Sequence, residues 1–457
     1  MAVTRRQFTS RAVAGALSTA AAATLTACGN KAASGGGTST GTSGGPSAGA
    51  GGGGGGTTAK AGKNILIGMN SGLVPQFQRY AADFQKAETG FNVTVKPVPD
   101  AQADYIQQLV TQGLSRSLPD IIFNYDALNQ TLNASHLLYD LKPWLDSGHD
   151  GLRGSAFEAN FLNQYRVGNA VTGIPVSADA SILYFNKTLL KKYGVTTMPT
   201  DTWTYDDLYR VAAEITNKSG GKTYGLGTPI GDGSGVFLFY PMLRAFGSNL
   251  YDPATKKFTF ANAGGIQAWT TLLKPYVDKF GTPYSTKDQS NNFPGRVAAM
   301  VVDTRPDIAR FRTALTDDWD VVPMPTMNGK STTGGGSYSL SVSARSGNKE
   351  GAYRFMAWFY SNAGGFKAAE PDGVVPATAA GLASGSWLTD KHPVPANLIP
   401  TTKYAVKNAI LPDPVPDAVQ PKVVPALQKA LQQVVLQHQS VQSAYGAAQD
   451  SLNALIK

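Results

Sequence analysis

The sequence predicts an α/β fold with a largely parallel sheet, and two observations carry this prediction. From residue 64 onward, short apolar runs alternate with amphipathic segments, which is the pattern of strands that alternate with helices. Hydrophobic residues make up 42% of the chain and charged residues 16%, which is enough apolar side chain for sizeable cores. The length of 457 residues allows two or three domains.

The first elements follow one another closely. Residues 65–69 form a short apolar run that is typical of a buried strand, and residues 75–88 carry apolar side chains at helical spacing. We then expect a strand at 93–95, a helix over 105–114 and a strand at 120–123.

Polar residues follow two of these strands directly. Asn70 and Ser71 follow the first strand, and Asn124, Tyr125 and Asp126 follow the strand at 120–123. Ligands of open α/β sheets bind beyond the carboxyl ends of the strands. These five residues are therefore candidate binding residues.

A helix start is predicted at Thr204. Its side chain can cap a helix over residues 205–216, with Asp207 at the capping-box position. Trp203 precedes this cap, where an aromatic residue usually packs, so we expect a structural role for it.

The second half of the chain continues the alternation. We expect a strand at 297–302 and helices over 349–361, 425–437 and 441–455. The last helix has an apolar stripe that is typical of a core face, formed by Val441, Tyr445, Ala448, Leu452 and Leu455.

The first 27 residues resemble an export signal. Arg5 and Arg6 precede Phe8, ahead of a mostly alanine stretch, as in twin-arginine signals. Thr9 departs from that pattern, so export by the general route also stays open. The alanine stretch is too short and too weakly apolar to span a membrane.

Cys28 ends the sequence Leu-Thr-Ala-Cys, which resembles the lipobox of bacterial lipoproteins. This resemblance implies removal of residues 1–27 and lipidation of Cys28. Residues 29–60 contain 14 glycines among 32 residues, and such a segment cannot bury enough apolar surface to fold. We therefore expect residues 28–63 to form a lipidated, flexible tether.

Composition argues against several other classes. A single cysteine excludes an intramolecular disulfide and a site with several thiolates, and the four histidines are scattered. We expect no metal site and no cofactor. The formal charge is +9, but lysine and arginine are dispersed, which argues against nucleic-acid binding.

Six short stretches carry a resemblance to a known family. In order, they are LPDIIF (118–123), GIP (173–175), LYFNK (183–187), TWTYDDL (202–208), FPGRVAAM (293–300) and GGG (334–336). Together, behind a lipobox, they resemble bacterial extracellular solute-binding lipoproteins of the maltodextrin-binding type. Such a protein is the sugar-binding subunit of an ATP-driven importer, an ABC transporter.

The resemblance implies a two-lobed periplasmic-binding-protein-like fold of the class II type. In that fold, crossing strands join two α/β lobes, and the ligand cleft lies between them. The implied lobe 1 is 64–178 with 340–375, and lobe 2 is 179–339 with 376–457. The implied crossings are near 177–183 and 336–343.

The resemblance also implies several ligand contacts. Asp179 matches an acidic contact at the first crossing, while Gly235 and Phe237 fall in the family's substrate segment. Gly235 lacks the acid of maltodextrin binders. Arg305 stands where those relatives offer a stacking tryptophan; it could bind sugar hydroxyls, pair with an acidic sugar, or lie on the surface at a helix start.

Tyr184 and Tyr338 complete the candidate pocket together with Asn124. A purely packing role is an alternative for Tyr338, because it lies in an expected crossing strand.

The implied function is an extracytoplasmic, lipid-anchored receptor. It would act as a monomer, bind a sugar or oligosaccharide, and deliver it to the membrane permease subunits of an ABC transporter by lobe closure. A binding protein for a polyamine or iron is the alternative, and an exported carbohydrate-active enzyme is a further one. No glycosidase signature accompanies the carboxylates, so we expect no catalysis.

Overall fold

The computed structural model describes most of the chain from residue 63 on. The described residues are 63–99, 102–115, 117–125, 128–228, 236–285, 289, 291–361, 364–365, 375, 377–384, 395–412, 415–416 and 419–456. The predictions for the signal, Cys28 and nearly all of the tether lie outside them. Within the described part, no helix combines the length and apolarity needed to cross a membrane.

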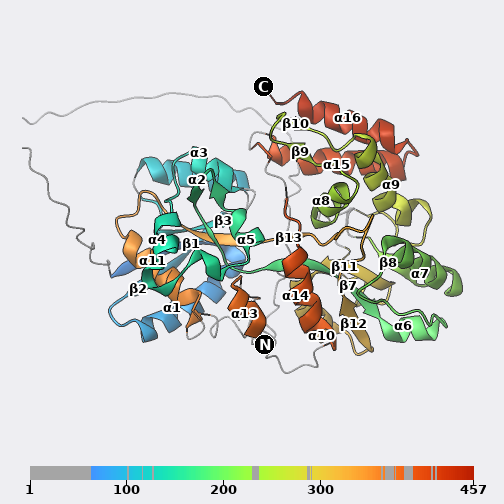
Figure 1. Ribbon diagram of the computed structural model, residues 1–457, viewed down its shortest axis with the longest axis horizontal. Coiled ribbons are helices and arrows are strands. Elements are labelled where there is room, and N and C mark those ends of the chain that lie inside the picture. Colours follow the sequence, from blue (N-terminus) through green and yellow to red (C-terminus); the bar gives the residue numbers. More distant parts are fainter. Residues whose placement is uncertain are drawn as a thin grey trace, which may run out of the picture. The chain divides into compact units, whose positions relative to one another are not determined.

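A five-stranded mixed sheet forms the centre of the first lobe (Figure 1). Its first three strands in chain order are parallel, whereas β14 runs antiparallel to both of its neighbours. In sheet order the strands are β2 (Asn92–Val98), β1 (Asn64–Asn70), β3 (Ile121–Tyr125), β14 (Tyr338–Val342) and β6 (Ile174–Pro175).

Aromatic side chains pack the helices of this lobe together. Phe84 of α1 (Val74–Ala87) contacts Phe355 of α11 (Lys349–Phe359), with their ring centroids 5.2 Å apart. Both residues are buried in the same cluster as the strand residues of β1 and β14. The apolar periodicity predicted for residues 75–88 therefore faces a core, as expected.

The second sheet is built around β7 (Asp179–Asn186). β11 and β12 pair with it in antiparallel fashion, and β8 runs parallel to β11. The other strands are β11 (Ala298–Thr304), β12 (Trp319–Val322), β8 (Tyr224–Gly227) and β13 (Gly335–Gly336), the last of which also pairs with β7.

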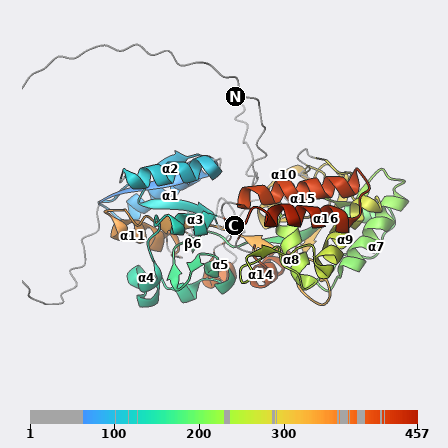
Figure 2. The same cartoon turned by 90° about the horizontal axis from the view of Figure 1, so that it is seen from above.

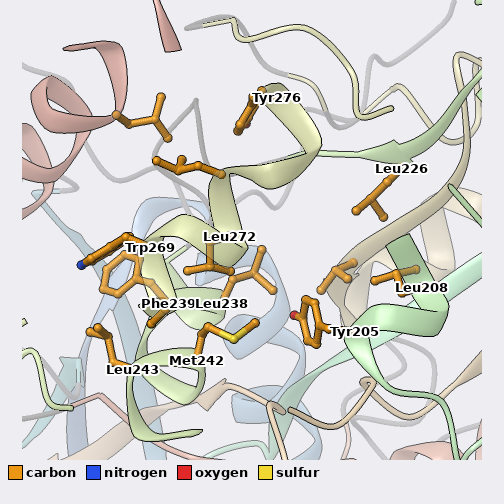
Figure 3. Packing of buried hydrophobic residues seen from close by; sticks show 14 of the residues in the cluster. Tyr205, Leu208, Leu226, Leu238, Phe239, Met242, Leu243, Trp269, Leu272 and Tyr276 are labelled. Atoms are coloured by element: carbon orange, nitrogen blue, oxygen red, sulfur yellow. The ribbon is translucent and has the colours of Figure 1, made fainter. Parts of the chain in front are cut away.

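Helices enclose a large core beside the second sheet. Figure 3 shows part of it, where Leu238, Met242 and Leu272 gather from two helices. In Figure 2, α15 and α16 run side by side, in keeping with their contacts. The helices of this core are α7 (Tyr205–Lys218), α8 (Val236–Ala245), α9 (Ala263–Val277), α15 (Gln420–Val435) and α16 (Val441–Asn453).

Shorter elements complete the described fold. The helices are η1 (Ser71–Leu73), α2 (Gln102–Leu114), α3 (Asn129–Ala134), α4 (Lys142–Ser147), η3 (His149–Gly151), η4 (Gly154–Ala156), α5 (Ala159–Asn163), α6 (Lys187–Lys192), η6 (Arg305–Asp307), α10 (Ile308–Ala314), α13 (Ala379–Ser384) and α14 (Leu398–Asn408). The strands form two small hairpin pairs, β4 (Arg166–Val167) with β5 (Ala170–Val171) and β9 (Tyr251–Asp252) with β10 (Lys257–Phe258).

Two local predictions are confirmed and one is wrong in part. Thr204 and Asp207 form the capping box, and Trp203 is buried. In the last helix Tyr445 stacks on Trp269, with a centroid distance of 4.2 Å. However, Leu455 is 50% exposed, because α16 ends at Asn453 and the chain leaves the helical spacing that the stripe assumed.

The two sheets are joined where two chain segments pass beside each other. β6 belongs to the first sheet and β7 to the second, so the chain crosses at residues 176–178. β13 pairs with β7, and β14 then enters the first sheet, so the return crosses at Ser337. Both crossings are shorter than predicted from the sequence, because β7 and β14 each lie wholly in one sheet.

Gly335 lies at a close approach in the return crossing. A Cβ placed there would lie 2.8 Å from the Ala409 Cβ and 3.0 Å from the Asp179 carbonyl oxygen. Both distances are shorter than van der Waals contact, so the crossing requires a residue without a side chain at this point.

We predict that Gly335→Ala destabilises the protein by about 1–3 kcal/mol, the usual cost of forcing an extra methyl group into packed surroundings. Gly347→Ala is the matched control, since a Cβ there meets nothing within 4 Å. Chemical denaturation of the two variants measures the difference. Equal stability of the two variants would contradict the close approach.

Candidate functional site

Asp179 lies at the point where the paired segments cross. It is the first residue of β7, opposite Gly336 of β13. Its Oδ2 accepts a hydrogen bond of 2.8 Å from the Ser177 hydroxyl, and its Oδ1 lies 3.6 Å from the Arg305 Nη2. Two polar side chains thus orient a carboxylate at the crossing.

The charges of this pair are partly withdrawn from water. Burial raises the pKa of Asp179, while the nearby Arg305 and the hydrogen bond from Ser177 oppose that rise. Burial likewise lowers the pKa of Arg305, but an arginine keeps its proton in proteins. The two side chains differ in exposure: the Asp179 side chain is 27% exposed and the Arg305 side chain 6%.

Tyr184 fixes the turn that carries Arg305. The turn η6 follows β11, and the Tyr184 hydroxyl donates to the carbonyl oxygens of Thr304 at 2.9 Å and Arg305 at 3.2 Å. Its ring is fully buried against Phe311, with centroids 4.8 Å apart. The structure therefore gives Tyr184, which has no exposed surface, a positioning role in the second lobe, whereas the sequence predicted a ligand contact in the pocket.

A second charged group lies beside Arg305. Arg310 donates to Asp307 at 2.8 Å and lies 3.5 Å from Asp303, whose Oδ1 accepts from the Thr304 amide. Burial, followed by the nearby charge of Asp307, raises the pKa of Asp303 well above its ordinary value. Sequence analysis missed this group, because nothing local distinguishes these residues from an ordinary helix start.

We predict that Asp303→Asn gains stability relative to wild type as pH rises. Folded wild type binds more protons than the unfolded chain between the ordinary and the raised pKa of Asp303, so its stability falls as pH rises through that window. The difference should be largest above the raised pKa and absent below the ordinary one. Thermal melts at acid and neutral pH measure it, and a gap independent of pH would contradict the raised pKa.

In the first lobe, Asn124 is buried in a polar cluster. Its Nδ2 donates to Asn129 at 2.9 Å and to Ser341 at 3.1 Å, and Thr172 donates to the same Asn129 oxygen. Asn124 has no exposed surface. The structure thus places it within the lobe, tying β3 to β14, whereas the sequence predicted a ligand contact in the pocket.

Tyr338 lies next to the return crossing. It is partly buried, pairs in register with Tyr125, and its ring centroid lies 4.8 Å from that of Phe123. The preceding residue, Ser337, offers its carbonyl oxygen to the Tyr165 hydroxyl at 2.8 Å. Tyr338 therefore packs against its own sheet and also lies at the edge where the sheets are joined.

The remaining candidate binding residues either lie at the end of β1 or fall outside the described part of the structure. The Asn70 side chain accepts from the Gly72 amide at 3.0 Å and caps η1, and Ser71 is exposed. Both occupy the carboxyl end of a parallel strand, as predicted. Asp126, Gly235 and the side chains of Tyr125 and Phe237 lie outside the described part of the structure.

A surface hollow of about 390 Å³ lies elsewhere, on α7 and the end of α9. Its lining includes Tyr209, Thr216, Lys274 and Phe280, and none of the predicted site residues. Among the described residues, no three His, Cys, Asp or Glu side chains gather closely enough to hold a metal ion.

Comparisons with known proteins agree with this fold. The chain is 23% identical over 299 residues to the multiple sugar-binding protein of Streptococcus mutans, covering 60% of this chain and 66% of that protein. It is 25% identical over 211 residues to a maltodextrin-binding protein of Bacillus subtilis, covering 45% of each. The matches thus span less than two thirds of these relatives' lengths.

Solved structures match over a larger share. The sugar-binding protein MalE of Xanthomonas citri superimposes with a TM-score of 0.75 at 16% identity, covering 86% of this chain and 97% of that one. A substrate-binding protein of Listeria monocytogenes in complex with cycloalternan gives 0.70 at 20% identity, covering 86% and 98%. These likenesses confirm the predicted two-lobed α/β fold.

The family model described as "bacterial extracellular solute-binding protein" matches residues 70–366, which is well over half of the chain. This range contains both crossings, the Asp179–Arg305 pair and every strand of the two sheets except β1. The chain belongs to the bacterial extracellular solute-binding protein family.

Proposed function

We propose that this protein is a lipid-anchored, extracytoplasmic receptor that binds a sugar or oligosaccharide and delivers it to an ABC transporter. It acts as a monomer, needs no cofactor, and meets the permease subunits at the membrane. The sugar-binding names of the relatives support the ligand class, and the family supports the location outside the cytoplasm.

The observation that carries this proposal is the oriented carboxylate at the crossing. A sugar presents hydroxyl groups, and each needs an acceptor that takes its hydrogen. Asp179 is such an acceptor, because Ser177 and Arg305 hold it in place while part of its side chain faces solvent. Charged acceptors make the stronger hydrogen bonds, so one carboxylate can contribute much of the recognition.

Lobe closure would complete the site. We assign residues 64–178 with 338–378 to one lobe and 179–336 with 379–457 to the other. Both later boundaries differ from those implied by the sequence, because Tyr338 begins a strand of the first sheet and Ala377 packs in the core of that lobe. In hinged proteins a few residues between elements absorb the change in backbone dihedral angles, so residues 176–178 and Ser337 are the expected hinge, while Asp179 moves with β7. X-ray scattering should show a smaller radius of gyration with bound sugar, and an unchanged radius would count against closure.

The charge pattern favours a sugar over a polyamine. A polyamine is a cation, and its site needs several acids that are open to the ligand. Here Asp179 is paired with Arg305 and Asp307 with Arg310, so the charge of each acid is already partly neutralised. The family and its structural neighbours are binding proteins, which favours recognition over catalysis. Spermidine belongs in the ligand panel as the direct comparison.

We predict that Asp179→Ala weakens sugar binding by about ten- to a hundredfold. Hydrogen bonds to a charged group contribute about 1.5–3 kcal/mol each, and about 1.4 kcal/mol is a factor of ten in Kd. Calorimetry of the purified protein against a carbohydrate panel first identifies the ligand, and then compares the variants.

The matched control is Asp201→Ala, because Asp201 is exposed in a turn. It should bind like wild type. Melting temperatures without ligand separate a lost contact from a damaged fold. Wild-type affinity in folded Asp179→Ala would move the site away from the crossing.

We predict that Cys28→Ala abolishes membrane anchoring. The lipobox-like sequence before Cys28 and the glycine-rich segment after it support an acylated N-terminus followed by a tether. Stable anchoring takes more than one acyl chain, which a diacylated cysteine supplies. Membrane fractionation and mass spectrometry of the mature N-terminus measure the change. An unmodified cysteine on released native protein would refute the anchor.

A further inference from the structure

The Asp179–Arg305 pair is asymmetric. The carboxylate side chain is 27% exposed, whereas the guanidinium side chain is only 6% exposed. A ligand that arrives at the crossing therefore meets the acid before it meets the base. The acid can accept from hydroxyl groups, but it repels a carboxylate or phosphate on the ligand.

Neighbouring residues restrain both Asp179 and the backbone that carries Arg305. The Tyr184 hydroxyl binds the backbone of Thr304 and Arg305, and Ser177 binds Asp179. β7 also fixes the backbone of Asp179 through its pairing with β13. The Asp179 carboxylate cannot turn far without breaking its hydrogen bond with Ser177, and the Arg305 guanidinium is confined by the burial of its side chain, so an anionic ligand would have to displace Asp179 to reach Arg305.

The other charged residues near the pair also provide little attraction for an anionic ligand. Arg310 lies with Asp307 at 2.8 Å and near Asp303 at 3.5 Å. Burial and the positive charge of a third arginine, Arg312, both lower the pKa of Arg305. Asp303 is a third acid, and burial raises its pKa. Arg305 and Arg310 are therefore each paired with an acid.

We propose that the Asp179–Arg305 pair makes this site select uncharged sugars over acidic ones, with Asp179 as the residue that sets the selection. This inference rests on the proposed function. It assigns Arg305 the role of neutralising and orienting Asp179. Of the roles that sequence analysis left open for Arg305, pairing with an acidic sugar is the one it opposes.

The experiment compares matched neutral and acidic ligands. Calorimetry measures glucose, galactose, mannose, maltose, maltotriose and cellobiose, and for each the uronate in which a terminal hydroxymethyl group is a carboxylate. Wild type should bind the best neutral ligand at least tenfold more tightly than its uronate. Asp179→Asn keeps the shape of the side chain but leaves Arg305 without this carboxylate, so the ratio should shift toward the uronate by at least tenfold.

Two further variants test the assignment. Asp179→Asn combined with Arg305→Met should lose the gained uronate affinity, because that gain depends on the guanidinium. Asp201→Asn removes an exposed acid elsewhere and should leave the ratio at the wild-type value. Melting temperatures of all variants confirm that each is folded at the assay temperature.

The outcomes separate the two proposals. A wild type that prefers the uronate, or a folded Asp179→Asn with an unchanged ratio, overturns this inference and leaves sugar binding standing. A wild type that binds no carbohydrate of the panel overturns the proposed function, and the inference with it. The predicted shift in Asp179→Asn, and its loss in the double variant, supports both.

Discussion

The close pairing of the two crossing segments is the constraint on which the rest of this structure depends. Gly335 allows β13 to lie against β7 and the neighbouring Ala409, and this pairing brings Gly336 opposite Asp179. The next residues, from Tyr338 on, already belong to the other sheet. A few residues of these two segments therefore connect the sheets and also set the position of the carboxylate at the crossing.

Placing charges at such a point is costly unless they are paired. Removing an ion from water costs several kcal/mol even after relaxation, and a well-oriented partner offsets that cost. Arg305 supplies the partner to Asp179, and Tyr184 holds Arg305 through its backbone. Tyr184 supports the candidate site without facing it, because its hydroxyl fixes the turn that carries Arg305.

The elements of this fold could be predicted because their signals are local. Apolar spacing predicted the strands and helices of the first sheet, and the Thr204 capping box predicted the start of α7. Local signals failed at the ends of elements, as at Leu455, where spacing continues past the last turn of the helix.

The site was harder to predict because it joins residues that are distant in sequence. Asp179 and Arg305 were each identified through the family resemblance, but their pairing was not, and the Tyr184 hydroxyl reaches a carbonyl 121 positions away. Asn124 shows the same limit. Its position after a strand suggested a surface contact, but Asn129 and Ser341 enclose it in the lobe.

The division of the core explains how such a protein can combine firm lobes with an adjustable site. Phe84 and Phe355 pack in the core of the first sheet, and Trp269 and Tyr445 pack in that of the second. The buried residues of the first cluster come from 65–176 and 340–377 and those of the second from 183–324 and 415–452, whereas a third cluster, with Phe161 and Phe311, spans the crossing. A ligand can shift the balance between two arrangements only by its difference in affinity for them. When neither of the first two cores must open, that difference can be small, and we propose that the hydrogen bonds of one oriented carboxylate supply it.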